Sequence, residues 1–296
     1  MKPASFEYHR PASLEEALAL FADLGSEAKV LAGGQSLVPA MNFRLARPEI
    51  LVDLNGNAAL AHIDQAPDGG LRIGAMTRQR TIERSSAVAA AAPLLFEAMP
   101  WIAHPQIRNR GTVGGSLAHA DPAAELPAVM VALEAQLLLQ SRAASRTIPA
   151  AEFQTGLLST ALQPDELLTE IRIPPRAARS GAAFVEVARR HGDFALVGVA
   201  AEVVLDRNGA CSAARVVLLS VGDGPVVATH AMGALAGRSP DAAAIDDAAR
   251  IAAEKDVDPP GDLHASSAYR RHLARVLVGR ALGTAVERAI ARRGAA

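Results

Sequence analysis

Two short glycine loops hold the residues of this chain that could bind a ligand. The first, Gly33-Gly34-Gln35-Ser36, follows the apolar residues 30–32, and the second, GTVGGS, occupies residues 111–116. A residue without a Cβ lets a ligand lie directly on the backbone, and successive free N–H groups in such a turn can hold an anion such as a phosphate. One Gly-Gly pair is more often only a tight turn. Two loops of the same character favour a ligand held by the backbone.

Other signatures of chemistry are missing from the sequence. No GxxxxGK[ST] is present, no GxGxxG opens a helix after a strand, and HExxH, paired CxxC and GxSxG are absent too. His104, His119, His191 and His264 lack the spacing of metal ligands. Cys211 is the only cysteine, and we expect it to be buried and inert, so no disulfide or iron–sulfur cluster can be built from this chain's thiols. Any catalytic chemistry would therefore have to be supplied by a bound cofactor.

Composition and charge are those of a globular chain. The chain has 296 residues, half of them apolar. Its net charge of −1 lacks the excess positive charge that is typical of a nucleic-acid-binding protein. The start, MKPASFEYHRPASLEE, has no apolar core of a signal peptide, and no charge-free apolar run is long enough for a membrane span. We expect a cytoplasmic protein without a membrane span.

The apolar spacing predicts the elements that position the two loops. Ser13 and Glu16 form a capping-box pattern, so a helix should begin there and end near Gly25. Further helices are expected over residues 82–99, interrupted at Pro93, and 125–133. Strands are expected at residues 28–32, 50–54, 71–76 and 135–139 and around 171–173.

Pro174-Pro175 is the expected boundary between two domains. Beyond it, strands at residues 183–189, 196–205 and 214–221 precede helices at 240–254 and 266–292. The predicted fold class is α+β. Residues 1–175 form one domain in two parts, about 1–57 and 58–175, and residues 180–296 form a three-stranded antiparallel sheet backed by helices.

Taken together, AGGQSLVPAMNFRLARPEILVDLN and RNRGTVGGSLAHADPAAELPAVMVAL resemble one family, the flavin-binding medium subunits of molybdenum hydroxylases. These belong to the carbon monoxide dehydrogenase and xanthine dehydrogenase group. The resemblance covers nearly the whole chain and includes F-x-Y-x-R-P-x-S-L-E-E-A, ELLTEIRIP, RRHGDFALVGVA and ASSAYRRHLARVLVGRAL. It implies an FAD-binding domain of the PCMH type, followed by a domain like the C-terminal domain of carbon monoxide dehydrogenase flavoproteins.

The resemblance also implies which residues bind FAD. Residues 32–37 would wrap the pyrophosphate with backbone N–H groups, and residues 112–116 would form the second half of the grip. Glu125 would suit a hydroxyl-rich part of the cofactor, or would simply be a carboxylate facing a helix dipole. Apolar and aromatic positions would flank the flavin, although Phe194 could instead be a core aromatic. The implied set is Ala32, Gly33, Gly34, Gln35, Ser36, Leu37, Ile102, Thr112, Val113, Gly114, Gly115, Ser116, His119, Asp121, Glu125, Leu168 and Phe194.

The function implied by the resemblance is electron transfer. Relatives take electrons from [2Fe–2S] clusters of a small partner subunit and pass them through FAD to a quinone, NAD or oxygen. A large partner subunit carries the molybdopterin cofactor and the substrate, and the complex would be a dimer of heterotrimers. This chain would then have no catalytic residue and no metal of its own.

Two alternatives and two departures accompany that interpretation. The chain could be a free-standing flavin oxidoreductase of the same fold, or a scaffold that binds no flavin. Val185 stands where the xanthine dehydrogenase branch has lysine. The first loop reads AGGQS where carbon monoxide dehydrogenases tend towards AGGHS.

Overall fold

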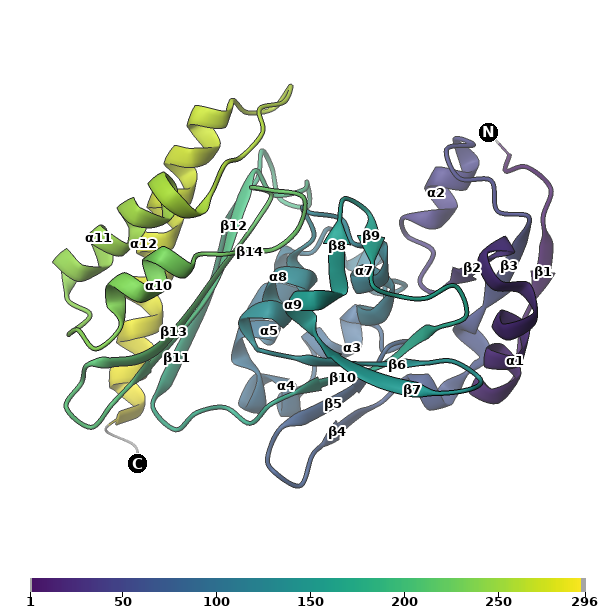
Figure 1. Cartoon of the computed structure of the whole chain (residues 1–296), viewed down its shortest axis with the longest axis horizontal. Helices are drawn as coiled ribbons and strands as arrows, with labels where there is room; N and C mark the ends of the chain where they lie inside the picture. The colour runs from purple at the N-terminus through teal and green to yellow at the C-terminus, as the bar shows by residue number, and fades with distance from the viewer. Residues whose placement is uncertain (1, 294–296) are drawn as a thin grey trace.

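The computed structural model describes residues 2–293 and arranges the chain as three successive parts (Figure 1). The N-terminal part lies at one end, the middle part in the centre, and the C-terminal part at the other end. Among these residues, no helix has both the length and the apolar character needed to cross a bilayer.

The N-terminal part is a small parallel sheet with two helices. Its strand order is β1-β3-β2, with β1 at Glu7–His9, β2 at Ala28–Leu31 and β3 at Ile50–Asp53. The predicted capping box is present at the start of α1 (Leu14–Leu24), where Ser13 Oγ accepts a hydrogen bond from the N–H of Glu16. A further helix, α2 (Leu37–Asn42), was not predicted and directly follows the first glycine loop.

The middle part is an antiparallel sheet of five strands covered by short helices. The strand order is β4-β5-β10-β6-β7, with bounds Ile63–Gln65, Leu71–Gly74, Leu167–Ile173, Gln136–Gln140 and Ser145–Pro149. The expected helix at 82–99 is divided into α3 (Gln79–Glu83), α4 (Ser86–Ala91) and α5 (Pro93–Ala98). The other helices are α6 (Pro105–Arg108), α7 (Val113–His119), α8 (Glu125–Ala132) and α9 (Ala150–Phe153), and a small hairpin joins β8 (Gln154–Gly156) to β9 (Ser159–Thr160).

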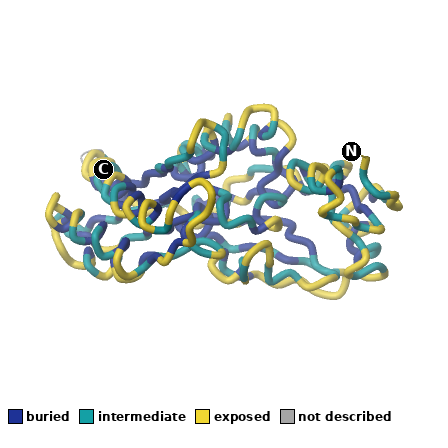
Figure 2. Tube along the Cα trace, turned by 90° about the horizontal axis from the view of Figure 1, so that it is seen from above, coloured by how far each residue is buried: buried dark blue, intermediate teal, exposed yellow. Residues whose placement is uncertain are grey.

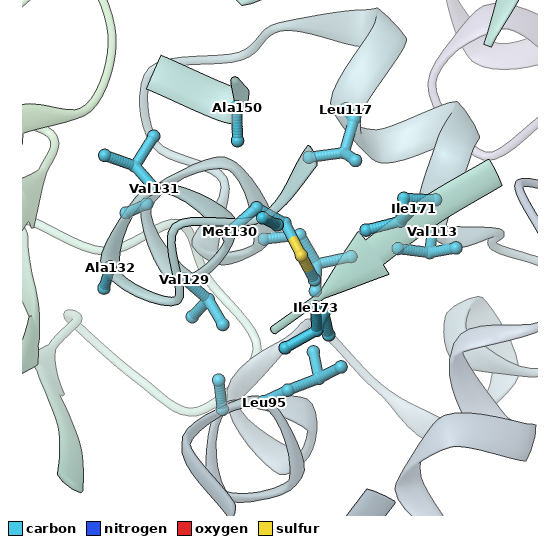
Figure 3. Close-up of a cluster of buried hydrophobic side chains, with 14 of the residues drawn as sticks. Leu95, Val113, Leu117, Val129, Met130, Val131, Ala132, Ala150, Ile171 and Ile173 are labelled. Atoms are coloured by element: carbon cyan, nitrogen blue, oxygen red, sulfur yellow. The ribbon is translucent and has the colours of Figure 1, made fainter. Parts of the chain in front are cut away.

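Helix α8 is the centre of the core of the middle part. Every residue of this helix is buried. Figure 3 shows Met130 of α8 among side chains from α5, α7 and β10, including Leu95, Leu117 and Ile171. Because the helix is apolar on every face apart from Glu125 at its first position, it must be enclosed on every side.

The C-terminal part is an antiparallel sheet with strand order β11-β12-β13-β14. The three long strands, at Ser180–Val187, Val197–Leu205 and Cys211–Leu219, correspond to the three that were predicted. The two-residue strand β14 (Val226–Val227) and the helix α10 (Thr229–Leu235) were not foreseen. Helices α11 (Ala242–Ile251) and α12 (Ser267–Arg293) complete this part.

Both faces of this sheet are buried, because side chains alternate along each strand. Phe184 joins the core of the middle part and lies 6.5 Å from Trp101 between ring centroids, whereas Ala183 packs on the side of α12. Buried residues accordingly run through the middle of the molecule and into the C-terminal part, whereas the outer loops consist mostly of exposed residues (Figure 2). The C-terminal sheet is therefore held between two layers of helices.

Candidate functional site

The two glycine loops lie against each other where the N-terminal and middle parts meet. A Cβ on Gly33 would lie 2.5 Å from the carbonyl oxygen of Arg110 and 2.7 Å from Cα of Gly111. A Cβ on Gly115 would lie 3.2 Å from Cβ of Ala32. We call residues 32–37 and 112–116 together the clamp. The sequence pointed to a ligand as the reason for these glycines, but at Gly33 the contact between the loops already requires one.

The first half of the clamp presents unused hydrogen-bond donors. Gly34 has a φ of +73°, a left-handed conformation that turns the chain out of β2 and towards α2. In the part of the chain that the structure describes, none of the N–H groups of residues 33–37 donates a hydrogen bond to protein. Unpaired N–H groups in a turn form a concave surface that suits phosphate oxygens. This cradle fits the pyrophosphate of a dinucleotide cofactor.

The second half of the clamp is internally bonded. The N–H groups of Val113, Gly114, Gly115 and Ser116 donate in turn to Thr77 O, Ala75 O, Thr112 Oγ1 and Thr112 O. Ser116 is half-buried, and its hydroxyl has no protein partner within residues 2–293. Because the backbone donors of residues 113–116 are occupied, these four residues can offer a ligand a hydroxyl group and the glycine surface rather than free N–H groups.

Asn55 and Arg78, which we call the brace, tie the two halves of the clamp together. Asn55 Nδ2 donates to the carbonyl of Ala32 at 2.8 Å, and Arg78 Nη2 donates to Asn55 Oδ1 at 2.6 Å. Arg78 Nη1 reaches the carbonyl of Arg110. Sequence reasoning missed both residues, since Asn55 was interpreted only as part of a turn and Arg78 belongs to no motif.

The remaining sequence-predicted positions lie outside the clamp. Ile102 and Leu168 are 8% and 7% exposed, so both are nearly enclosed. Phe194, in the loop between β11 and β12, is 64% exposed and is therefore not a core aromatic. His119 is exposed at the end of α7, and Asp121 Oδ1 accepts a hydrogen bond from the N–H of Ala123 at 2.9 Å. Val185, the departure noted above, packs against the core on the α12 side of its sheet.

Glu125 is buried at the first position of α8, and a second buried carboxyl interacts with it across the domain junction. Burial raises the pKa of Glu125 to about 7, with nearby Asp121 adding to the effect. Burial also raises the pKa of Glu186, on β11, to about 8, and the charge of Glu125 adds to it. Glu186 Oε2 has no protein partner within residues 2–293. No motif marks Glu186, because its strand is otherwise built mostly of small and apolar residues.

Arg108 fixes the segment that carries Ile102. Its Nε and Nη2 donate to the two carboxylate oxygens of Glu83 at 2.9 and 3.0 Å, and its Nη1 donates to the carbonyl of Ile102 at 2.6 Å. The side chain is buried, so this forked pair is largely shielded from solvent.

We expect Arg108→Lys to lower the free energy of unfolding by about 1–2 kcal/mol, because lysine cannot reproduce the fork. Urea unfolding measures the change. Arg80→Lys is the matched control, since Arg80 pairs with the same Glu83 but is more exposed, and its loss should stay within about 0.5 kcal/mol. Equal losses in the two variants would contradict a special role for the buried fork.

Comparisons with known proteins cover nearly the whole chain. A family model described as the FAD binding domain in molybdopterin dehydrogenase matches residues 4–176, and one described as the CO dehydrogenase flavoprotein C-terminal domain matches residues 182–285. The chain is 45% identical over 289 residues to the 6-hydroxypseudooxynicotine dehydrogenase complex subunit alpha of Paenarthrobacter nicotinovorans, covering 98% of this chain and 97% of the relative.

Solved structures agree with these matches. A chain of carbon monoxide dehydrogenase from Hydrogenophaga pseudoflava has a TM-score of 0.93 and 40% identity, with 97% of this chain and 99% of that chain covered. A chain of quinoline 2-oxidoreductase from Pseudomonas putida 86 has a TM-score of 0.92 and 38% identity, with 98% and 100% covered.

Proposed function

Because this chain belongs to the family of FAD-binding medium subunits of molybdenum hydroxylases, we propose that it carries electrons from the [2Fe–2S] clusters of a partner subunit through FAD to a quinone, NAD or oxygen. A second partner, with the molybdopterin cofactor, would bind and hydroxylate the substrate. The assembly would be a cytoplasmic dimer of heterotrimers. On this proposal, the chain itself selects no carbon substrate.

The observation that carries the proposal is the row of N–H groups in residues 33–37 that donate no hydrogen bond within the described chain, in a clamp whose other half is held by backbone hydrogen bonds. We assign the FAD pyrophosphate to Ala32, Gly33, Gly34, Gln35, Ser36 and Leu37, with Thr112, Val113, Gly114, Gly115 and Ser116 on the other side. Bound FAD supplies the ability to collect single electrons and release two together. The protein's task is to hold and orient it.

Residues outside the clamp are assigned to the rest of the cofactor. Ile102, Leu168 and Phe194 would flank the flavin, and the exposed ring of Phe194 is free to do so. His119, Asp121 and Glu125 would face its polar parts. A carboxyl with a pKa of about 7 is protonated below that pH, so Glu125 could donate a hydrogen bond to the cofactor as well as accept one.

The test separates an electron-relay subunit from a free-standing flavoenzyme. The chain would be purified alone and together with its two partner subunits, and flavin absorbance, iron, molybdenum and substrate oxidation would be measured. We expect FAD in both samples, but substrate oxidation only in the complex. Turnover of a carbon substrate by the isolated chain would overturn the relay, and loss of flavin in both samples after reconstitution would favour a scaffold.

We expect Arg78→Met to weaken FAD binding by about 10- to 100-fold, since hydrogen bonds from a charged group contribute about 1.5–3 kcal/mol and the clamp would lose its brace. Titration of the apoprotein with FAD gives the dissociation constant. Arg84→Met is the control, because Arg84 is exposed and its side chain makes no hydrogen bond or ion pair within residues 2–293. An unchanged dissociation constant for Arg78→Met would show that the brace does not hold the clamp.

A further inference from the structure

A cavity of about 240 Å³ lies beside the brace, between the end of β3 and the start of α3. Its lining residues come from two segments, 54–63 and 76–81, and include Asn55, Asn57, His62, Thr77, Arg78 and Thr81. Asn55 and Arg78 also hold the clamp, so the cavity and the clamp share these two side chains.

One buried donor at this cavity has no partner. Asn57 is 4% exposed, and its Nδ2 makes no hydrogen bond to protein in the described chain. Leaving such a group unpaired in the folded protein is destabilising. Asn57 lines the cavity, but its Nδ2 is shielded from solvent, so an acceptor bound there satisfies the amide by drawing it towards the cavity.

The cavity wall is also positive. None of its lining residues is an aspartate or a glutamate, and Arg78 supplies a full charge. Two of the five N–H donors of Arg78 are engaged, both by uncharged oxygens, and within residues 2–293 no carboxylate pairs with it. Burial and the neighbouring Arg110 lower the pKa of Arg78, as expected for a cation without a close counter-ion.

Three carboxylates lie near this wall, and the most exposed of them, Asp64, has its Oδ2 3.9 Å from His62 Nε2. The other two already accept hydrogen bonds from neighbouring side chains. Asp53 accepts hydrogen bonds from Tyr8 and Asn55. Glu170, which lies 3.4 Å from His62 Nε2, is paired with Arg72 and Arg172. The charge of Asp53 acts on Arg78 and offsets part of the lowering of its pKa, but within residues 2–293 none of these carboxylates forms an ion pair with Arg78, so the guanidinium remains available to a ligand.

We propose that this cavity is a second binding site, which takes a small oxyanion such as phosphate, free or as the end of a phosphomonoester. The ligand accepts hydrogen bonds from Asn57 and Arg78 and neutralises the cation of the brace. Since the brace joins the two halves of the clamp, the anion and FAD each strengthen the binding of the other. This coupling rests on the proposed function, whereas the anion site itself does not.

The test uses the FAD-loaded protein, in which the clamp is already occupied. Inorganic phosphate is titrated in a calorimeter, with chloride at matched ionic strength as the reference, and adenosine monophosphate is titrated separately. We expect saturable binding of phosphate with a dissociation constant of about 1 mM or tighter. Binding of adenosine monophosphate with similar affinity would extend the site to phosphomonoesters, and its failure to bind would restrict the site to the free oxyanion.

Asn57→Leu, which keeps the volume and removes the amide, should weaken phosphate binding at least tenfold. Asn57→Ser serves if the leucine variant does not fold, and Asn208→Ala, in an exposed hairpin turn, is the matched control. FAD absorbance and the fluorescence of Trp101 verify the fold of each variant. No saturable binding to wild type, or equal binding by the Asn57 variants, would overturn the site.

The coupling is measured as the rate of FAD dissociation with phosphate and with chloride. Slower release in phosphate, lost in Asn57→Leu, supports it. Equal rates with intact phosphate binding would refute the coupling and leave the anion site standing. A protein that binds phosphate but never FAD would instead refute the proposed function.

Discussion

Replacing Gly33 and Gly114 together by valine is expected to abolish FAD retention, lowering affinity more than about 100-fold, while the C-terminal part remains folded. A Cβ on Gly33 would lie 2.5 Å from Arg110 O, and one on Gly114 would lie 2.5 Å from Ala75 Cβ and 2.8 Å from Ala75 O. Overpacking of this kind costs about 1–3 kcal/mol per site and is relieved by moving backbone. Here the backbone that must move is the clamp itself.

Two measurements distinguish a spread clamp from an unfolded protein. Flavin absorbance after gel filtration reports FAD retention, and the fluorescence of Trp101, the chain's only tryptophan, reports the junction with the C-terminal sheet through its contact with Phe184. Gly233→Ala is the control, because a Cβ there meets nothing within 4 Å. Normal flavin content in the double variant would refute the two-loop clamp, and loss of the native Trp101 signal would show that the effect is global.

The two glycine loops could be found from sequence because glycine is a strong local signal, whereas their pairing as a clamp was implied by the family resemblance. A pair of glycines after an apolar strand already predicts a backbone turned outward, and the second loop repeats the pattern. The brace could not be found in this way. Asn55 and Arg78 come into contact only after β3 and β5 have each joined a separate sheet. The local sequence around either residue therefore does not predict the contact.

The fold shows the same division between local and long-range information. The capping box at Ser13 and the three long C-terminal strands follow from local pattern, and both are present. The short helix α2 has Pro39 inside its six residues and too few positions to show a helical period, so the sequence did not reveal it. The sequence analysis placed helices behind the C-terminal sheet, but its second face is covered by α5 and α8 of the middle part.

The buried pair Glu125 and Glu186 should make stability fall as pH rises from about 5 to 9. Both carboxyls have pKa values in the folded protein, about 7 and about 8, that exceed the ordinary 4.5 of an unfolded glutamate. The folded protein therefore keeps protons that the unfolded chain has already released, and unfolding releases protons. The free energy of unfolding then decreases with pH, beginning near 4.5 and levelling off above about 8, by at least about 3 kcal/mol.

The variant Glu186→Gln isolates this pair from other titrating groups. Glu83 and Glu170 have lowered pKa values, because arginines hold their charged forms, so they act at lower pH. Half-buried Glu202 has a raised pKa and contributes in the same direction, but equally in both proteins. We expect Glu186→Gln to lie within about 1 kcal/mol of wild type at pH 5 and to be more stable by about 2–3 kcal/mol at pH 9. Urea unfolding at each pH provides the comparison.

Exposed Glu152→Gln, as the control, should follow wild type at every pH. A Glu186→Gln curve parallel to that of wild type would mean that the two carboxyls are not kept protonated by burial. If the free energies of unfolding of Glu186→Gln and wild type agree at pH 5 and differ at pH 9, the effect lies between the middle and C-terminal parts. Glu125 is the first residue of α8, and Glu186 lies on β11. Two negative charges would then face each other across the boundary between the middle part and the C-terminal part, the same boundary beside which we place the flavin.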